Sequence, residues 1–351
     1  MSSNEAGSFT CPLPISATDR VLLGHGSGGK LTAELIEKLI VPAFANPALD
    51  QLDDQAIVAV DQTRLAFTTD SYVITPIFFP GGDIGELAVN GTINDLACGG
   101  ARPIALSLAF ILEEGLPLAD LRRVVESARR AAAAAGVSIV TGDTKVVGRG
   151  SGDQIFINTS GIGVVPAGTT LGSAQVRAGD AILLSGPIGD HGVAIMARRA
   201  GLELEGDIVS DTAALHELAA AVLRACPDVH AMRDPTRGGV AATLVEIATR
   251  RRLGIEVDEA AIPVREPVRG ACELLGLDPL LVANEGKLVV FVPEASAEVA
   301  LSALRAHSLG RHAARIGSVT DIHPGVVELT TPVRGRRLLD LPFAEPLPRI
   351  C

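Results

Sequence analysis

Aspartates stand at the ends of predicted strands and helices in the first half of the sequence. Asp70 closes the strand-like segment AFTTD, and Asp95 lies within an apolar helical segment. A carboxylate in an apolar setting must be paired or bound to a metal, because desolvation of the isolated charge is costly. Solvated surface acids are the alternative, but such oxygens also suit hard cations, so we predict a cation site. Its candidate ligands are Asp53, Asp54, Asp61, Asp70, Asp95 and Asp143.

The stretch GHGSGGKL, residues 24–31, nearly matches the phosphate-binding P-loop pattern. Leu31 stands where that pattern needs a magnesium-binding hydroxyl, and Thr32 comes one place late, which excludes a Walker-type nucleotide site. Glycines that lead into a helix can still wrap phosphate with backbone N–H groups, whereas a mobile loop is the alternative. The residues that we expect to contact phosphate are Gly26, Ser27, Gly28 and Gly29.

The segment DPTRGG, residues 234–239, precedes a predicted helix. An arginine and two glycines at a helix entrance suit an anion. A helix cap made by the aspartate or the threonine is the simpler alternative. The candidate binding residues of this segment are Asp234, Arg237, Gly238 and Gly239.

Two further segments place charged residues next to predicted strands. In VTGDTKVV, residues 140–147, Asp143 and Lys145 follow a strand that we predict to be buried, and a surface hairpin is the alternative. In ANEGKLVV, residues 283–290, Glu285 stands at the entrance of a strand, and a simple turn is the alternative.

The chain ends on a cysteine, Cys351, that follows Pro342, Pro346 and Pro348. Prolines favour an extended arm of roughly 3 Å per residue, so ten residues span about 30 Å, enough to swing from solvent into a cleft. The nearby α-carboxylate disfavours the thiolate through like-charge repulsion. We therefore interpret Cys351 as a carrier on an arm rather than as a resident base or a strong nucleophile.

The other cysteines and the histidines indicate neither a disulfide framework nor a zinc site. The five cysteines are scattered without a CxxC pair, and the seven histidines show no HExxH spacing. A reducing cytoplasm is the simplest compartment for such a chain.

The elements that must position these residues alternate between strands and helices. Strands are predicted over 55–80, 103–112, 137–143 and 155–165, and helices over 83–100 and 117–136. After a break near 166–177 the alternation resumes, which predicts an α/β or α+β fold in two domains. We expect a disordered leader, an N-terminal domain, a C-terminal α/β domain and a flexible tail over 1–19, 20–166, 176–330 and 331–351, respectively.

Composition excludes several function classes. The chain of 351 residues has 41 acids against 30 bases, for a net charge of -11. This balance argues against general binding of nucleic acid or anionic membranes, and 3% aromatics without tryptophan provide no platform for stacked bases. The sequence contains no run of about 18 apolar residues, so we predict no transmembrane helix. The polar N-terminus lacks a signal-peptide pattern.

Taken together, the motifs resemble the HypE family of hydrogenase maturation proteins, within the superfamily of aminoimidazole ribonucleotide synthetase and selenophosphate synthetase. The resemblance runs from about residue 20 to residue 351. It implies a two-domain fold whose N-terminal domain forms a β-barrel shared in a homodimer, with ATP in a groove near the interface. The motifs that carry it are HGSGGK, TTDSYVITPIFFPGGDIGELAVNGTINDLACGGARP, FILEEGLP, VTGDTKVV, DPTRGG, ANEGKL and the terminal PRIC.

The resemblance also implies the reaction. A HypF protein places a carbamoyl group on Cys351, ATP drives its dehydration to a thiocyanate, and the cyanide passes to iron on a HypC–HypD complex. By the same resemblance, Lys145 and Glu285 flank the carboxamide. Glu285 is the predicted base because a carboxylate is ionised at pH 7 without tuning, whereas Lys145 either orients or deprotonates the group. The resemblance implies Asp54, Asp70 and Asp95 as the magnesium ligands. It also implies that Asn94 and Asp143 belong to the ATP site.

Two alternatives belong to other classes. A kinase or synthetase of the same superfamily would act on a free small molecule and would not need Cys351. A non-enzymatic scaffold would pass a group between partners without turning over ATP.

Overall fold

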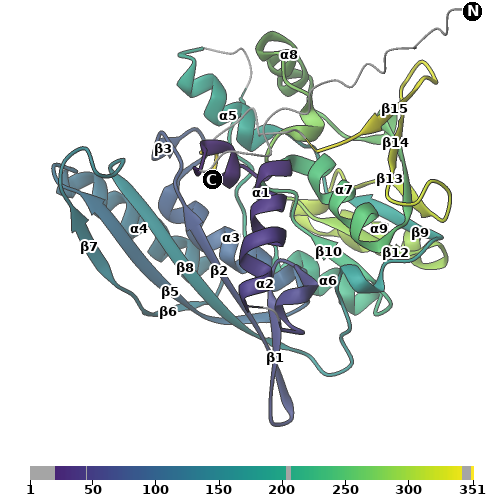
Figure 1. Cartoon of the computed structure of the whole chain (residues 1–351), viewed down its shortest axis with the longest axis horizontal. Helices are drawn as coiled ribbons and strands as arrows, with labels where there is room; N and C mark the ends of the chain where they lie inside the picture. Colours follow the sequence, from purple (N-terminus) through teal and green to yellow (C-terminus); the bar gives the residue numbers. More distant parts are fainter. Residues whose placement is uncertain (1–19, 45, 203–206, 342–348) are drawn as a thin grey trace, which may run out of the picture.

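The computed structural model describes residues 20–44, 46–202, 207–341 and 349–351 (Figure 1). The predicted leader, residues 1–19, and most of the predicted proline arm, residues 342–348, lie outside the described residues. Two sheets, each with its own helices, stand side by side and confirm the expected mixture of strands and helices.

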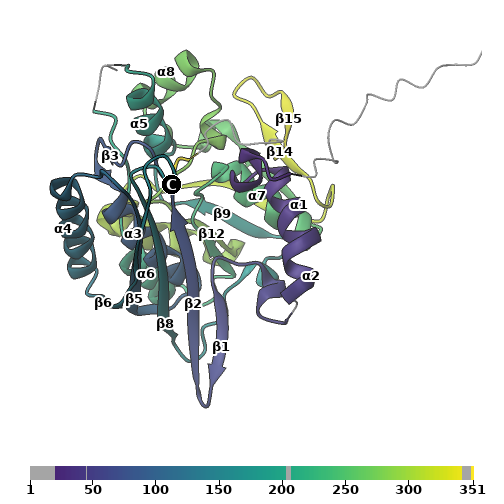
Figure 2. The ribbon, with the colours of Figure 1, turned by 60° about the vertical axis from the view of Figure 1, so that its left-hand side comes forward.

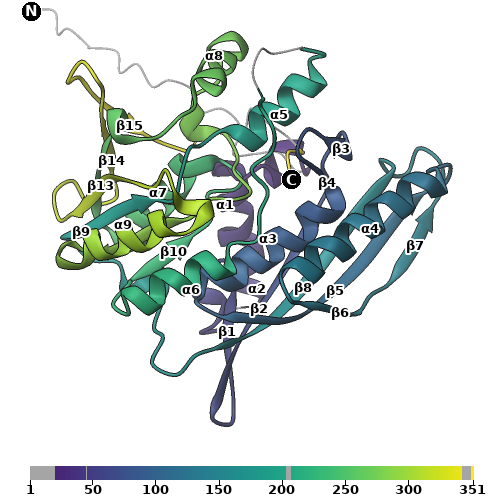
Figure 3. The same ribbon diagram turned by 180° about the vertical axis from the view of Figure 1, so that it is seen from behind.

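The N-terminal domain is a six-stranded sheet with helices on one face. The strand order is β1-β2-β8-β5-β6, and β7 also pairs with β5. Helices α3 (Ile84–Cys98) and α4 (Leu118–Ala134) cover one face (Figure 3). A short hairpin of β3 (Phe78–Phe79) and β4 (Gly82–Asp83) precedes α3. The six strands are β1 (Ala56–Val60), β2 (Thr63–Tyr72), β5 (Arg102–Glu113), β6 (Ser138–Thr141), β7 (Thr144–Val147) and β8 (Ile155–Val165).

Helix α3 forms as its local sequence predicts. The Asp83 side chain accepts hydrogen bonds from the backbone N–H groups of Gly85 and Glu86, which caps the first turn. The helix ends at Cys98, and Gly100, two residues later, has a φ of +68°, in the left-handed region that favours glycine. Every residue of α3 is buried except Glu86 and Asp95. The helix is therefore packed on nearly all sides, and Asp95 is one of its two residues that are not fully buried.

The other face of this sheet is apolar and uncovered in the single chain. Side chains alternate along β8, so Ile157 points to the helices while Ile162 points away from them. Phe67 on β2 is 46% exposed, although it is aromatic and lies mid-strand. The sheet is open among the described residues, so one chain does not itself close the barrel that the resemblance implies. Exposed apolar residues that the strand register places on this face include Val58, Val60, Phe67, Ile111 and Ile162.

The C-terminal domain is a seven-stranded sheet between two layers of helices. The central strands β9 (Asp180–Leu184) and β12 (Val289–Pro293) are almost wholly buried. The sheet order is β10-β12-β9-β13-β11-β14-β15, and only the β11–β14 pair is parallel. The remaining strands are β10 (Ala231–Arg233), β11 (Gly254–Asp258), β13 (Ala314–Thr320), β14 (Val327–Thr330) and β15 (Arg336–Leu339).

Helix α7 packs on one face of this sheet, and α6 and α9 pack on the other. Figure 1 shows α5 and α8 at the edge of the domain, near the C-terminus of the chain. The five helices are α5 (Asp190–Arg199), α6 (His216–Ala225), α7 (Gly239–Arg251), α8 (Glu266–Leu275) and α9 (Ala297–Ala306).

Strand β15 corrects the predicted tail, which was expected to begin at residue 331. Residues 336–339 pair antiparallel with β14 and complete the sheet edge. Leu339 is buried in the domain core, so the sequence RRLL is a strand despite its two arginines.

The N-terminal segment lies beside the C-terminal domain rather than with its own sheet. Figure 2 shows α1 (Lys30–Leu35) and α2 (Val41–Phe44) running past α7. A single turn of π-helix, Ile36–Ile40, joins the two. Within the described part of the chain, no helix is both long and apolar enough to cross a membrane.

Candidate functional site

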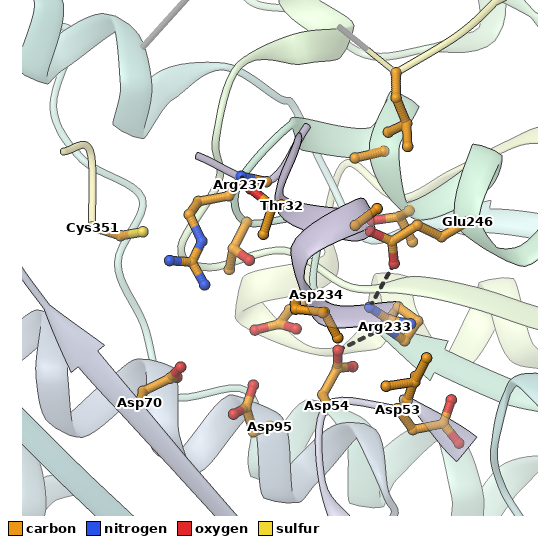
Figure 4. Close-up of a pocket in the computed structure, with 18 of the residues that line it drawn as sticks. Thr32, Asp53, Asp54, Asp70, Asp95, Arg233, Asp234, Arg237, Glu246 and Cys351 are labelled. Atoms are coloured by element: carbon orange, nitrogen blue, oxygen red, sulfur yellow. Dashed lines mark hydrogen bonds and ion pairs between the residues drawn. The ribbon is translucent and has the colours of Figure 1, made fainter. Parts of the chain in front are cut away.

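A cavity of about 540 Å³ lies between the two domains, beneath α1. Its walls come from α1, β2, α3, α7 with the segment before it, and the end of the chain (Figure 4). Sequence-predicted residues from distant parts of the chain meet here, which is what a common site requires. Those that line the cavity are Gly28, Asp53, Asp54, Asp70, Asp95, Asp234, Arg237, Glu285 and Cys351.

Asp95 reaches the cavity from the buried helix α3. The Thr68 hydroxyl donates a hydrogen bond to Asp95 Oδ2 at 2.6 Å. Burial, together with the nearby charges of Asp70 and Asp234, raises the pKa of Asp95 well above its ordinary value. The charged form is therefore disfavoured until a cation neutralises the cluster.

Asp54 faces the same cluster but already has a cationic neighbour. Arg233 Nε lies 2.7 Å from Asp54 Oδ1, and the second oxygen, Oδ2, is buried without a hydrogen-bond partner among the described residues. Burial raises the pKa of Asp54 well above its ordinary value despite Arg233. Asp53 turns elsewhere, since its Oδ1 accepts hydrogen bonds from Ser173.

Asp234 completes the group of carboxylates. Burial raises its pKa to about 6, although Arg233 acts in the opposite direction. Its Oδ1 accepts a weak hydrogen bond from the buried Cys98 thiol at 3.8 Å. Ligand atoms of Asp54, Cys98 and Asp234 all lie within 4.8 Å of one another. Clustered carboxylates with raised pKa values and an unpartnered oxygen fit a divalent cation, because the cation would remove the repulsion and satisfy that oxygen.

Glu285 lies at the cavity wall, held by its backbone. Its N–H donates to Asp211 Oδ1 at 3.0 Å, and Asn94 Nδ2 donates to its carbonyl oxygen at 3.2 Å. The side chain is 3% exposed, and its Oε1 is buried without a hydrogen-bond partner within the described ranges. Burial, followed by the charges of Asp234 and Asp211, raises the pKa of Glu285 well above its ordinary value. The sequence led us to expect that Glu285 needs no tuning, whereas burial disfavours its charged form.

Asn94 lies away from the cavity lining and joins the two domains. Its Nδ2 also donates to the Ala213 carbonyl at 3.1 Å, and its Oδ1 accepts the Leu215 N–H at 2.8 Å. The side chain, predicted as part of the ATP site, is thus occupied with positioning the Glu285 segment and the start of α6.

The glycine-rich segment and DPTRGG pack against each other. Gly28 has φ +86°, and a Cβ there would lie 2.8 Å from Arg237 Cβ. Gly238, with φ +76°, and Gly239, with φ +63°, make the turn into α7, whose side lines the cavity with Thr243 and Glu246. Of these residues Gly28 and Arg237 line the cavity, whereas the neighbouring predicted residues Gly26, Ser27, Gly29, Gly238 and Gly239 stand behind the lining.

Lys145 and Asp143 lie outside the cavity. Lys145 Nζ pairs with Asp143 Oδ2 at 2.7 Å, and both side chains are mostly exposed. The preceding strand β6, predicted to be buried, is exposed at all four positions, so that prediction is wrong for the single chain. Lys145 pairs in register with Ile111, which places it on the uncovered apolar face of the N-terminal sheet.

The end of the chain enters the cavity. Cys351 lies among the lining residues, and Figure 4 shows its sulfur directed inward, near Arg237. The Cys351 carbonyl oxygen accepts a hydrogen bond from the Val73 N–H at 3.1 Å. The last residues are therefore docked, whereas the sequence had predicted a flexible end.

Sequence reasoning missed several residues that complete the site. Arg233 pairs with Asp54 and lies 3.5 Å from Glu246 of α7, and its signal was its place directly before DPTRGG. Tyr72 lines the cavity, and its hydroxyl donates to Asp70 Oδ2 at 3.2 Å. Gly91 of α3 makes room for that hydroxyl, since a Cβ there would lie 2.2 Å from it.

Comparisons with known proteins agree with this arrangement. Residues 52–165 match the N-terminal domain model of AIR synthase related proteins, and residues 177–329 match the C-terminal one. A protein named carbamoyl dehydratase HypE from Azotobacter vinelandii is 57% identical over 327 residues, covering 93% of this chain and 96% of that protein.

Two solved structures are similar over most of the chain. The structure of a HypE–HypF complex has a TM-score of 0.83 at 45% identity, covering 88% of this chain and 99% of the matched one. A HypE structure in complex with ATP has a TM-score of 0.80 at 50% identity, covering 95% and 100%, respectively.

Proposed function

This chain belongs to the HypE family of carbamoyl dehydratases, and we propose that it uses ATP to dehydrate an S-carbamoyl group on its own Cys351. The product is a thiocyanate that supplies cyanide for the iron of [NiFe]-hydrogenase. The observation that carries this proposal is the position of Cys351, which lies in the same cavity as Glu285 and the cluster of aspartates.

The carboxamide oxygen must be activated before it can leave. Transfer of the ATP γ-phosphoryl group to this oxygen turns it into phosphate, which is a good leaving group. Loss of the amide protons and cleavage of the C–O bond then give the nitrile, with ADP, phosphate and one proton as the other products. The helix N-terminus of α7 and Arg237 are suited to hold phosphate near Cys351.

Mg²⁺ fits the aspartate cluster. We propose Asp54, Asp70 and Asp95 as its ligands, with Asp234 beside them. When bound, the ion neutralises charge on the transferring phosphoryl group. The unpartnered Oδ2 of Asp54 supports this assignment, whereas the ion pair with Arg233 leaves only that oxygen for the metal.

Glu285 is proposed to remove a proton from the carboxamide nitrogen. Its raised pKa results from burial and then from the negative charge of Asp234 and Asp211. Neutralising the aspartates lowers that pKa toward the working range of a general base. Asp211, held by Lys287 at 2.8 Å, and Asn94 fix the backbone from which the side chain projects.

We further propose that two chains pair through the uncovered face of the N-terminal sheet and close the barrel together. The five exposed apolar side chains on alternate positions support this pairing, because a monomer would leave them in water. Lys145 stands on the same face, so in a dimer it could approach the carboxamide of the partner chain, where we retain it as a proposed orienting group.

The partners follow from the chemistry. A HypF protein would donate the carbamoyl group, in line with the solved HypE–HypF complex. A HypC–HypD complex would accept the cyanide, and the cytoplasm is the proposed compartment.

The three cysteines at positions 98, 226 and 272 are buried free thiols, which leaves Cys351 as the accessible carrier among the described cysteines.

Intact-mass analysis of the C-terminal peptide tests the function. After incubation with HypF, carbamoyl phosphate and ATP, the tail should gain a carbamoyl group and then lose the mass of one water. Cys351→Ala should remove both species. Asp95→Asn should still accept the carbamoyl group but fail to dehydrate it. ATP turnover that persists without Cys351 would favour a kinase for a free small molecule, and a carbamoylated tail without ATP turnover would favour a scaffold.

A further inference from the structure

The last three residues are bound as a peptide ligand would be. Arg349, Ile350 and Cys351 are held by groups from both domains, and none of these groups adjoins them in the sequence. We name the set that holds them the tail cradle. It consists of Val73, Thr75, Asp153, His191, Arg199 and Ser210.

Two side chains of the tail are recognised individually. The Arg349 guanidinium pairs with Asp153, donates to Thr75 Oγ1 at 2.7 Å and donates to the Val73 carbonyl at 3.1 Å. Ile350 is 1% exposed and packs in the core cluster that also contains α3 and α5. A charged anchor and an apolar anchor in adjacent positions select a short sequence rather than any chain end.

The cradle also binds the backbone of the tail. His191 Nε2 contacts the Ile350 carbonyl at 2.8 Å, and the Ser210 hydroxyl lies 2.8 Å from His191 Nδ1, which fixes the ring. Phe79 packs edge-on against the same imidazole. Arg199 donates to the Arg349 carbonyl and to the Thr75 carbonyl. These groups are buried or part-buried, and Ser210, Phe79 and the Thr75 carbonyl hold His191 and Arg199 through contacts that do not involve the tail.

We propose that the tail cradle is a binding site for peptides ending in Arg-Ile-Cys, and that it does not require the peptide to be joined to the chain. An S-carbamoyl peptide supplied in solution would then be dehydrated at the same site. This inference rests on the proposed function. The dehydration has the same products as with the chain's own tail. The carboxamide oxygen leaves on phosphate, ATP becomes ADP, and one proton is released.

Tethering explains why the natural substrate needs no high affinity. A ligand joined to its site by a short linker has an effective concentration in the millimolar range. A free peptide with the same contacts should bind with a Kd of roughly 10 μM to 1 mM, since few atoms carry the interaction and the peptide must be ordered.

The test uses the full chain with a substituted tail that no longer occupies the tail cradle. The variant R349S/I350E/C351S keeps every cradle residue but replaces the three residues that occupy the cradle. The synthetic peptide EPLPRIC, carbamoylated on its cysteine, is added with Mg²⁺ and ATP, and mass spectrometry follows the loss of one water. Thermal unfolding of the variant shows that it is folded. We expect conversion to saturate with peptide concentration. The peptide EPLPRAC should need a concentration at least about tenfold higher for half-maximal conversion.

A charge exchange tests recognition directly. Asp153→Arg in this background should weaken binding of a labelled, uncarbamoylated EPLPRIC at least about fivefold, measured by anisotropy. The peptide EPLPEIC should lose binding to the background variant and recover it with Asp153→Arg. Recovery requires direct contact, which a general effect of the substitution on folding would not produce.

A second measurement uses the unaltered protein. Excess EPLPRIC should displace the tail and speed alkylation of Cys351, whereas EPLPEIC should not. If the intact protein dehydrates its own tail but neither converts nor binds the peptide at millimolar concentration, the inference is overturned and the proposed function stands. If the intact protein fails to dehydrate its own tail while the peptide binds, the proposed function fails and the cradle stands as a peptide site.

Discussion

Replacement of Ile350 by alanine should release the tail from the cavity. The Ile350 side chain is 1% exposed, so the substitution removes three buried carbons. At about 0.8 kcal/mol for each buried methylene, the docked state loses roughly 2.4 kcal/mol. Because 1.4 kcal/mol is a factor of ten, the ratio of undocked to docked chains should rise about 50-fold.

Alkylation of Cys351 measures that population, because a docked thiol must leave the cavity before it reacts. When docking is fast compared with alkylation, the rate follows the undocked fraction. The C-terminal peptide is quantified by mass spectrometry after short exposure to an alkylating reagent, so the other cysteines do not interfere. The matched control is Ile322→Ala, the same substitution at a side chain that is 55% exposed.

An increase below about threefold in the ratio of undocked to docked chains for Ile350→Ala would refute this reasoning, since it would mean that the burial of Ile350 contributes almost nothing to docking. An equal increase for Ile322→Ala would also refute it, because the effect would then be a general loss of stability.

Three further predictions concern the base, the dimer and a buried ion pair. Glu285→Gln should bind ATP and accept the carbamoyl group, yet form thiocyanate about 10²–10⁴-fold more slowly, and wild-type rates across pH 6–9 would contradict its role as base. Phe67→Asp should weaken dimerisation at least about 100-fold, because each dimer loses two partly buried rings, and sedimentation at several concentrations measures this. Burial alone would raise the pKa of Asp211, but the ion pair with Lys287 and hydrogen bonds hold it below its ordinary value. A depressed pKa in the folded state gives stability that is present above the unfolded pKa and lost as pH falls through the folded one. The Tm of the wild type should therefore fall faster between pH 5 and 3 than that of Asp211→Asn/Lys287→Met, and parallel curves would contradict this linkage.

Short-range signals explain what the sequence allowed us to predict. The bounds of α3 follow from a capping aspartate, Asp83, and the glycine stop at Gly99 and Gly100, all of which act within one helical turn. The aspartates of the cavity could also be identified, because a carboxylate among apolar residues needs a partner wherever the chain goes.

Features that depend on distant contacts could not be read in the same way. Strand β6 has the apolar composition of a buried strand, but its burial depends on a surface that one chain does not supply. Nothing local to His191 indicates that its ring contacts Ile350, which lies 159 positions later. Proline content indicated an extended arm, yet the docking of the last three residues is decided by the tail cradle on both domains.

The tyrosine beside Asp70 gives this protein an optical signal of its own. Tyr72 is the single tyrosine in a chain without tryptophan, so ultraviolet emission comes almost entirely from one ring at the wall of the cavity. Its hydroxyl donates to the Asp70 carboxylate, and such an acceptor quenches tyrosine emission. A cation that draws Asp70 away should brighten the ring, so occupancy of the cavity can be titrated in the unlabelled protein.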